Sequence, residues 1–367
     1  MIRLSKWKRM LQKLGVPDQP RAERGSATGL AAQYGLNSTF TSAAIKNIST
    51  SGIYLVTENR LRTNELITLI LHEEGKPENS SELQFSVHAR VARQGEEGIG
   101  LSFVLPPGLD TNLWGVLVRN IVTLTEPDQI ADMFRTLRTI LFLCRLCQSG
   151  AEEAILLFGG QFDKEHVETL VKIALAAENK LASEPDFDRR RAHPKLVANI
   201  LREGSWSSDE PIIQLWAGLL VSSCSVDEPD DSNQVFVNLL THIGPDLVRI
   251  FIYACEQALT SAQGAENSPS SSVVVTAEEL IALTSVSDVA RNATSVAYLF
   301  NLGLVQKLPD FTTYHPFEKF DIAPTRMGLE LYKHCHGDRG KVDEQLVLTA
   351  EEHLRDILPQ PTAMTSE

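Results

Sequence analysis

The hydrophobic pattern of the chain changes its period once, near Pro106, and this change constrains the fold more than any other feature. Between residues 25 and 105, apolar and β-branched residues alternate with polar ones, and Gly and Ser mark the turns. Such alternation is typical of strands that bury one face. We expect strands at residues 30–34, 41–48, 53–57, 66–72, 83–94 and 99–104. Six short strands of this kind form a small barrel or a sandwich.

Helical periodicity dominates after Pro106 and predicts helices at residues 110–122, 127–147, 163–180, 194–202, 209–223, 233–241 and 245–260. A Ser-, Ala-, Gly- and Asn-rich linker follows. Beyond it we expect a helix at 276–283 with Thr276 as its N-cap and Glu279 at N3, a helix at 287–302, a hairpin-like stretch at 304–322 and a helix at 325–334. This order is that of a winged helix-turn-helix unit.

The predicted fold is therefore a multi-domain α+β protein, in which six antiparallel strands, arranged as a barrel or a sandwich, precede an all-helical region that ends in a winged helix. At 367 residues the chain is long enough for two or three domains. We divide it into a basic helix and Arg-bearing linker (1–24), a barrel or sandwich with a C-terminal helix (25–122), a helical region (123–260), a linker (261–272) and a winged-helix-like domain with its tail (273–367).

The charge is unevenly distributed along the chain. The 34 Lys and Arg against 47 Asp and Glu give a net charge of −13, which argues against a general nucleic-acid binder. Residues 1–24 hold seven cations and two acids, a net of +5, so the remainder carries −18. Leu4, Trp7, Leu11 and Leu14 form one apolar stripe of a basic helix at 2–14. This helix suits docking to the acidic body, to a second copy or to a partner protein; binding to an anionic membrane surface and a solvated arm are the alternatives.

Cysteine usage and the lack of a targeting signal indicate the cytoplasm. The five cysteines are odd in number and show no disulfide framework. The N-terminus has no apolar core of a secretory signal, so we expect a cytoplasmic protein, peripheral to the inner membrane if the basic helix binds lipid. Cys144 and Cys147 lie in an apolar helical stretch, and Cys335 lies between His334 and His336. This spacing favours packing over metal binding, and we expect no metal.

No pattern of catalytic residues is recognisable. The histidines do not show the H-E-x-x-H spacing, no G-x-S-x-G elbow occurs, and Gly159-Gly160 lacks the surroundings of a phosphate-binding loop. We expect a protein that is not an enzyme.

The segment Asn47-Ile-Ser49-Thr-Ser-Gly52 closes one predicted strand and opens the next. Together with Leu61-Arg-Thr-Asn64-Glu65, where Asn64 replaces a family Gly, and the strand pair at 88–93 and 98–103, it resembles the PilZ domain family over residues 20–122. The resemblance implies a six-stranded barrel that binds cyclic di-GMP, with no catalytic cofactor.

The resemblance also implies the ligand-binding residues: Arg21, Arg24, Asn47, Ser49 and Gly52. Guanidinium groups bind phosphate oxygens and guanine O6 and N7, and short polar side chains complete such a site. The arginine pair is spaced R-x-x-R, one residue shorter than the family's R-x-x-x-R. The alternative is that Arg21 and Arg24 are solvated linker residues and that 47–52 is only a turn the fold requires.

A second resemblance covers residues 195–336. Asp209 to Leu220, with Trp216 at its centre, then Phe236-Val-Asn-Leu-Leu and Gly244-Pro-Asp-Leu are similar to the Abi-alpha family of phage-abortive-infection proteins. The alternative is that Trp216, Leu219 and Leu220 are the core stripe of a helix.

These observations predict a PilZ-type cyclic di-GMP receptor that transmits ligand binding to a helical output domain through protein–protein contacts. A ligand-free PilZ adaptor, with a role in phage defence, is the alternative. A DNA-binding regulator is a third class, but residues 273–336 hold five cations against seven acids, and the would-be recognition helix offers only Arg291. We therefore expect no nucleic-acid partner and a winged helix used for protein interaction or dimerisation.

Overall fold

The structure is a computed structural model that describes residues 30–36, 39–73, 84–109, 111–123, 127–158, 163–229, 231–262, 272–309 and 319–339. The expected helix at 2–14, Arg21, Arg24 and the segment 310–318 lie outside these ranges. The chain divides into two compact units, and each is described by itself. The N-terminal unit comprises residues 1–179 and 186–198, and the C-terminal unit comprises 180–185 and 199–367. The five-part division made from the sequence stays a prediction.

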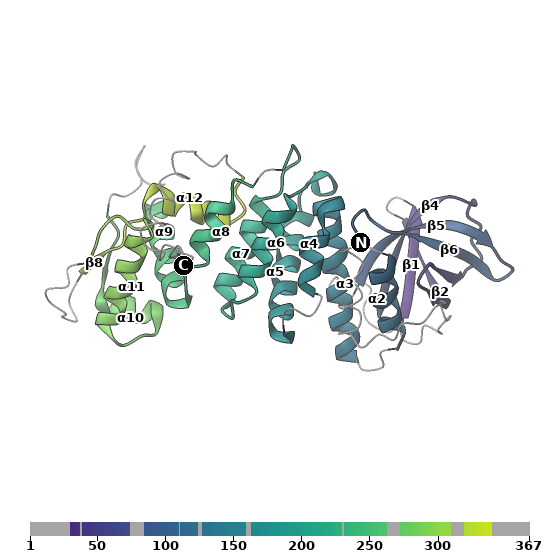
Figure 1. The fold of residues 1–367 in the computed structure, drawn as a ribbon, viewed down its shortest axis with the longest axis horizontal. Coiled ribbons are helices and arrows are strands. Elements are labelled where there is room, and N and C mark those ends of the chain that lie inside the picture. Colours follow the sequence, from purple (N-terminus) through teal and green to yellow (C-terminus); the bar gives the residue numbers. More distant parts are fainter. Residues whose placement is uncertain are drawn as a thin grey trace, which may run out of the picture. The chain divides into compact units, whose positions relative to one another are not determined.

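Six antiparallel strands close into a barrel in the N-terminal unit, in the order β1-β2-β3-β6-β5-β4 (Figure 1). They are β1 (Leu30–Leu36), β2 (Thr39–Ser49), β3 (Gly52–Val56), β4 (Leu66–Glu73), β5 (Gln84–Gln94) and β6 (Gly98–Val104). The predicted six-stranded barrel is confirmed, and the sandwich is excluded because β1 pairs with both β2 and β4.

Side chains alternate between the barrel interior and its outer surface, except at two bulges. On β3, Ile53 and Leu55 are buried and Tyr54 faces outward. One register shift lies between Ile45 and Asn47 on β2, and the other lies between Val91 and Arg93 on β5. Each bulge adds one residue, which reverses the face that the following side chains occupy.

Helices α2 (Thr111–Thr123) and α3 (Pro127–Cys147) pack on the barrel and share its core (Figure 1). Trp114 of α2 is fully buried, with its ring 5.1 Å from that of Phe103 and 6.4 Å from that of Phe85. The Phe85 ring in turn contacts the ring of Phe134 of α3, with 5.4 Å between the ring centroids. The barrel therefore completes its hydrophobic core with these two helices.

The helical elements that follow are α4 (Glu152–Ile155), flanked by short 3₁₀ turns at Gln148–Gly150 and Leu156–Phe158, then α5 (Lys164–Ala182), a 3₁₀ turn at Phe187–Arg189 and α6 (Pro194–Gly204). The α5 and α6 helices confirm predicted ones, whereas the elements between 148 and 158 were not expected. Among the residues that the structure describes, no helix is both long and apolar enough to cross a membrane.

The C-terminal unit contains α7 (Glu210–Ser222), α8 (Gln234–Leu240), α9 (Pro245–Ala262), α10 (Ala277–Thr284), α11 (Val289–Asn301) and α12 (Arg326–Cys335). Its core includes Trp216, Phe236 and Phe251. The expected capping box is confirmed, because the Thr276 side chain accepts from the Glu279 N–H and the Glu279 carboxylate accepts from the Thr276 N–H.

A small two-stranded sheet belongs to the same unit. Strand β7 (Val274–Thr276), which was not expected, pairs antiparallel with β8 (Lys319–Asp321), and Val305 makes an isolated bridge to Pro324. The predicted hairpin at 304–322 is thus only partly described, and the winged-helix ending stays a prediction.

Asn64 occupies the turn before β4 with a φ of 72°, in the left-handed region. Asn is the ordinary residue that best tolerates this region, after Gly. We expect Asn64→Gly to leave the thermal stability unchanged or raised, and Asn64→Val to lower the free energy of unfolding by about 1–2 kcal/mol. Thr63→Val, at the neighbouring position without a positive φ, is the control in the same melting experiment. Equal losses for both valine variants would contradict this explanation.

Candidate functional site

The turn between β2 and β3 is held by its own residues. The Ser49 hydroxyl donates to the Gly52 carbonyl oxygen at 3.1 Å, and the Phe103 N–H donates to the Ser51 carbonyl oxygen at 3.1 Å. A Cβ at Gly52 would lie 2.1 Å from the Leu101 carbonyl oxygen. Position 52 therefore requires glycine because the neighbouring strand β6 approaches the turn closely. Ser49 and Gly52 thus have structural roles in this turn.

Asn47 is half-buried on the outer surface of the barrel, directly opposite Tyr54 of β3. Its carboxamide forms no hydrogen bond with any other residue that the structure describes, and both its donors and its acceptor are available. Of the three predicted site residues inside the described ranges, Asn47 therefore has the side chain best placed to meet a ligand.

Asn47 begins a row of residues that crosses four strands. Tyr54 lies opposite Asn47, Gly100 lies opposite Tyr54, and Arg93 lies opposite Gly100. Adjacent strands are about 4.8 Å apart, so the row from Asn47 to Arg93 spans about 14 Å. The next outward-facing row contains Ser49, Gly52, Ser102 and Arg90.

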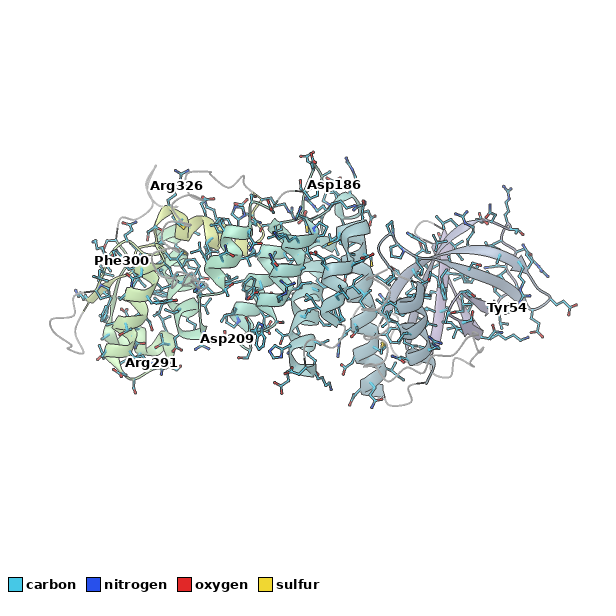
Figure 2. The ribbon with its side chains drawn as sticks, in the orientation of Figure 1. Tyr54, Asp186, Asp209, Arg291, Phe300 and Arg326 are labelled. Carbon is cyan, nitrogen blue, oxygen red and sulfur yellow. The ribbon has the colours of Figure 1, made fainter. Side chains whose placement is uncertain are left out.

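Tyr54 lies on the barrel (Figure 2), between Asn47 and Gly100 in the row that begins at Asn47. A Cβ at Gly95 would be 2.1 Å from the Tyr54 hydroxyl oxygen, so the Tyr54 ring extends over the turn between β5 and β6. The Lys46 ammonium and the Arg93 guanidinium each lie 5.9 Å from the ring centroid, at the limit of cation–π distance. The Tyr54 ring is therefore accompanied by two cations.

The cations around Tyr54 differ in their partners. Lys46 forms an ion pair with Glu97, and this hydrogen bond and the charge attraction raise the pKa of Lys46 and lower the pKa of Glu97. Arg60 donates to the Gly95 carbonyl oxygen at 3.0 Å, and Arg90 donates to the Asn64 carbonyl oxygen at 3.0 Å. The Arg93 guanidinium forms no hydrogen bond within the described ranges, and it is exposed.

The predicted residues Arg21 and Arg24 lie outside the described residues, so the structure does not place them. Sequence reasoning missed Tyr54 and Arg93. Tyr54 could have been found from its spacing of two residues after Gly52, which puts both on one face of a strand. Arg93 is signalled only by a break in the alternation, because strict alternation from the buried Val91 would have turned an arginine into the barrel.

The cysteines are buried and reduced in the part of the chain that the structure describes. Burial raises the pKa of the Cys144 thiol to about 12 and raises the pKa of Cys335 as well. His334 is buried and His336 is exposed, with its ring 4.0 Å from that of Tyr332. The described residues bring together no group of three or more metal-ligating side chains. Burial of all five thiols agrees with the packing interpretation.

The residues around Trp216 that carry the second resemblance belong to the core of the C-terminal unit. Trp216, Leu219 and Leu220 are at most 1% exposed, and the Trp216 indole N–H donates to the Ser207 hydroxyl at 3.2 Å. The interpretation of these residues as a helical core stripe is confirmed. Arg291 lies on α11 (Figure 2), and its guanidinium is ion-paired with the Asp246 carboxylate at 3.0 Å.

Comparison with protein families gives two matches. The PilZ domain matches residues 19–118, which agrees closely with the resemblance at 20–122. The family described as abortive infection alpha matches residues 164–347, just over half of the chain, and extends the resemblance at 195–336 to include α5. Comparison with curated proteins gives no match.

Proposed function

Because the chain belongs to the abortive infection alpha family and carries a PilZ domain in its N-terminal unit, we propose that it is a cytoplasmic receptor that binds cyclic di-GMP and transmits binding to its helical region. It acts through protein–protein contacts, without catalysis. The observation that carries this proposal is the outward-facing carboxamide of Asn47, which has no partner among the described residues and lies beside the turn of the PilZ motif.

The position of β1 supports a role for Arg21 and Arg24. The register of β1 and β2 puts Ala31 opposite Ala44, so the chain enters β1 close to the end of β2 that leads to Asn47. Arg24 precedes Leu30 by six residues, which an extended chain spans with at most about 22 Å. This reach allows both guanidinium groups to bind a ligand that also contacts Asn47. In the proposed mechanism the ligand draws the basic N-terminal segment onto the barrel, which changes the position of residues 2–14.

Packing within the N-terminal unit supports transmission from the turn to the helices. A Cβ at Gly115 of α2 would lie 3.1 Å from the Thr50 methyl group, so the turn and the helix are in close contact. One residue before Gly115, Trp114 contacts Phe85, which contacts Phe134 of α3. A ligand that fixes the turn at 49–52 would therefore bias the packing of α2 and α3.

Calorimetric titration tests the proposal. Cyclic di-GMP is titrated into the full chain, into the Arg21→Ala/Arg24→Ala variant and into Arg62→Ala, whose exposed side chain lies in the turn before β4. We expect heat of binding for the wild type and for Arg62→Ala, and an affinity lower by at least about 10-fold for the double variant, because two charge-assisted contacts are lost. The absence of heat for the wild type, or identical curves for all three proteins, would exclude the receptor function.

A ligand-free adaptor in phage defence is the second candidate function. The observation that favours it is the hydrogen bond from Ser49 to the Gly52 carbonyl oxygen, which gives these two residues of the motif a structural role in the turn. Plaque counts on cells with and without the gene test this function, and equal counts over a panel of phages would exclude a role in phage defence.

A DNA-binding function has less support. The charge of Arg291 on α11 is neutralised by Asp246, and phosphate contacts require free cations. We propose that the C-terminal region contacts protein, as a winged helix used for interaction or dimerisation.

A further inference from the structure

The two bulges of the barrel lie at opposite ends of one row. The bulge on β2 follows Ile45 and turns Asn47 outward, and the bulge on β5 follows Val91 and turns Arg93 outward. Both side chains would face the apolar interior if the strands alternated strictly, and an unpaired guanidinium there would be strongly unfavourable. Bulges commonly redirect side chains next to binding sites. The backbone is thus irregular at the two positions that bring Asn47 and Arg93 to the same surface.

The Arg93 side chain packs against neighbouring residues, but its guanidinium hydrogen-bond donors have no partner among the described residues. A Cβ at Gly100 would lie 2.9 Å from the Arg93 Cγ and 3.2 Å from its Nε, so the Arg93 side chain crosses directly over Gly100. Its guanidinium lies beside the Tyr54 ring. No hydrogen bond to another described residue occupies its donors, in contrast to Lys46, which is paired with Glu97. A guanidinium in this setting keeps its planar set of donors available to a ligand.

We propose that Arg93 is a further binding residue for cyclic di-GMP, and that it donates to O6 and N7 of one guanine, which lies against the Tyr54 ring. The inference rests on the proposed ligand. A guanidinium matches the two acceptors of that guanine edge, whereas adenine offers one acceptor and one donor there. Aromatic rings and guanidinium planes are the surfaces on which unpaired bases stack. Asn47, at the other end of the row, contacts the same ligand from the far side.

Titration of cyclic di-GMP into Arg93 variants of the full chain tests the assignment. We expect Arg93→Ala to weaken binding by about 10- to 100-fold, the range of one guanine contact made by two hydrogen bonds. Arg93→Lys is expected to retain only part of the affinity, because an ammonium keeps the charge but not the planar pair of donors. Arg62→Ala removes another exposed arginine, outside the row, and is expected to bind like the wild type.

The affinity for cyclic di-AMP provides a second measurement, because loss of the Arg93 charge alone would weaken the binding of both cyclic dinucleotides equally. The wild type is expected to bind cyclic di-GMP more tightly than cyclic di-AMP, and Arg93→Ala is expected to reduce this preference by the same 10- to 100-fold, because the affinity for cyclic di-AMP changes little. An equal weakening for both ligands would overturn the assignment to a guanine edge.

The outcomes separate this inference from the proposed function. If the wild type binds cyclic di-GMP and Arg93→Ala binds it equally well, the role of Arg93 is wrong and the receptor function stands. If the wild type binds no cyclic di-GMP, the receptor function is wrong and the role of Arg93 is wrong with it. Unchanged circular dichroism of the Arg93 variants shows that a loss of binding does not come from unfolding, since Arg93 is exposed.

Discussion

Trp114→Ala is expected to lower the free energy of unfolding of the N-terminal unit by about 3–5 kcal/mol. Trp114 of α2 is fully buried against the barrel, in contact with Phe103 and Phe85, and alanine would leave a large cavity in the core that the barrel shares with its helices. Scanning calorimetry of the full chain measures the effect, because it separates the transitions of different units where these are independent.

Two further tryptophan variants sharpen this prediction. Trp114→Phe keeps most of the ring packing and removes an indole N–H that has no hydrogen-bond partner in the described structure, so we expect a loss below about 2 kcal/mol. Trp206→Ala, at a side chain that is 67% exposed, is expected to change the stability by less than about 0.5 kcal/mol. If Trp114→Ala were as stable as Trp206→Ala, the barrel and α2 would not share a core.

Gly218→Ala is expected to lower the free energy of unfolding of the C-terminal unit by about 3 kcal/mol or more. A Cβ at Gly218 of α7 would lie 1.6 Å from the Cys335 carbonyl oxygen and 3.1 Å from the His336 nitrogen. Both atoms belong to the backbone at the end of α12, so no side-chain rotation relieves the overlap. The two helices would have to separate, and contacts on both sides of the interface would weaken.

Gly244→Ala is the matched control, because a Cβ at Gly244 would meet nothing within 4 Å. It changes the residue that precedes α9 by the same single methyl group, and we expect an effect below about 1 kcal/mol. Scanning calorimetry compares the two variants directly. Equal melting temperatures for Gly218→Ala and Gly244→Ala would contradict the tight crossing of α7 and α12.

The strands of the barrel could be predicted from the sequence to within one or two residues because most of them bury one face. Alternation of apolar residues is a direct consequence of that burial. The α3 helix was predicted with its observed bounds, 127–147, because it also buries one face, and burial of a helix face gives apolar residues a period of 3.6 residues. Elements whose stability comes from distant partners carry no such signal, as β7 illustrates: its three residues pair with a strand more than 40 residues further along the chain.

The candidate site was predictable only in part. Asn47, Ser49 and Gly52 could be found because they form a local motif, and the left-handed φ of Asn64 explains why Asn stands where the family has Gly. Arg93 was missed because its only signal is a break in the alternation, since polar residues stand at 88 and 90 and then at 93. The pairing of β5 with β6 shows that a bulge at Ala92 absorbs this break and keeps Arg93 on the outer face.

The bulges also determine which changes in chain length the ligand-facing surface can accept. Loss of the one extra residue, Lys46 on β2 or Ala92 on β5, would remove the bulge without exchanging the faces of the strand beyond it, because Asn47 would then follow the inward-facing Ile45 directly and Arg93 would follow Val91 directly. Both side chains would stay on the outer surface, opposite Tyr54 and Gly100. This surface can therefore accept the deletion of either extra residue, although the strand on one side of the bulge becomes one residue shorter.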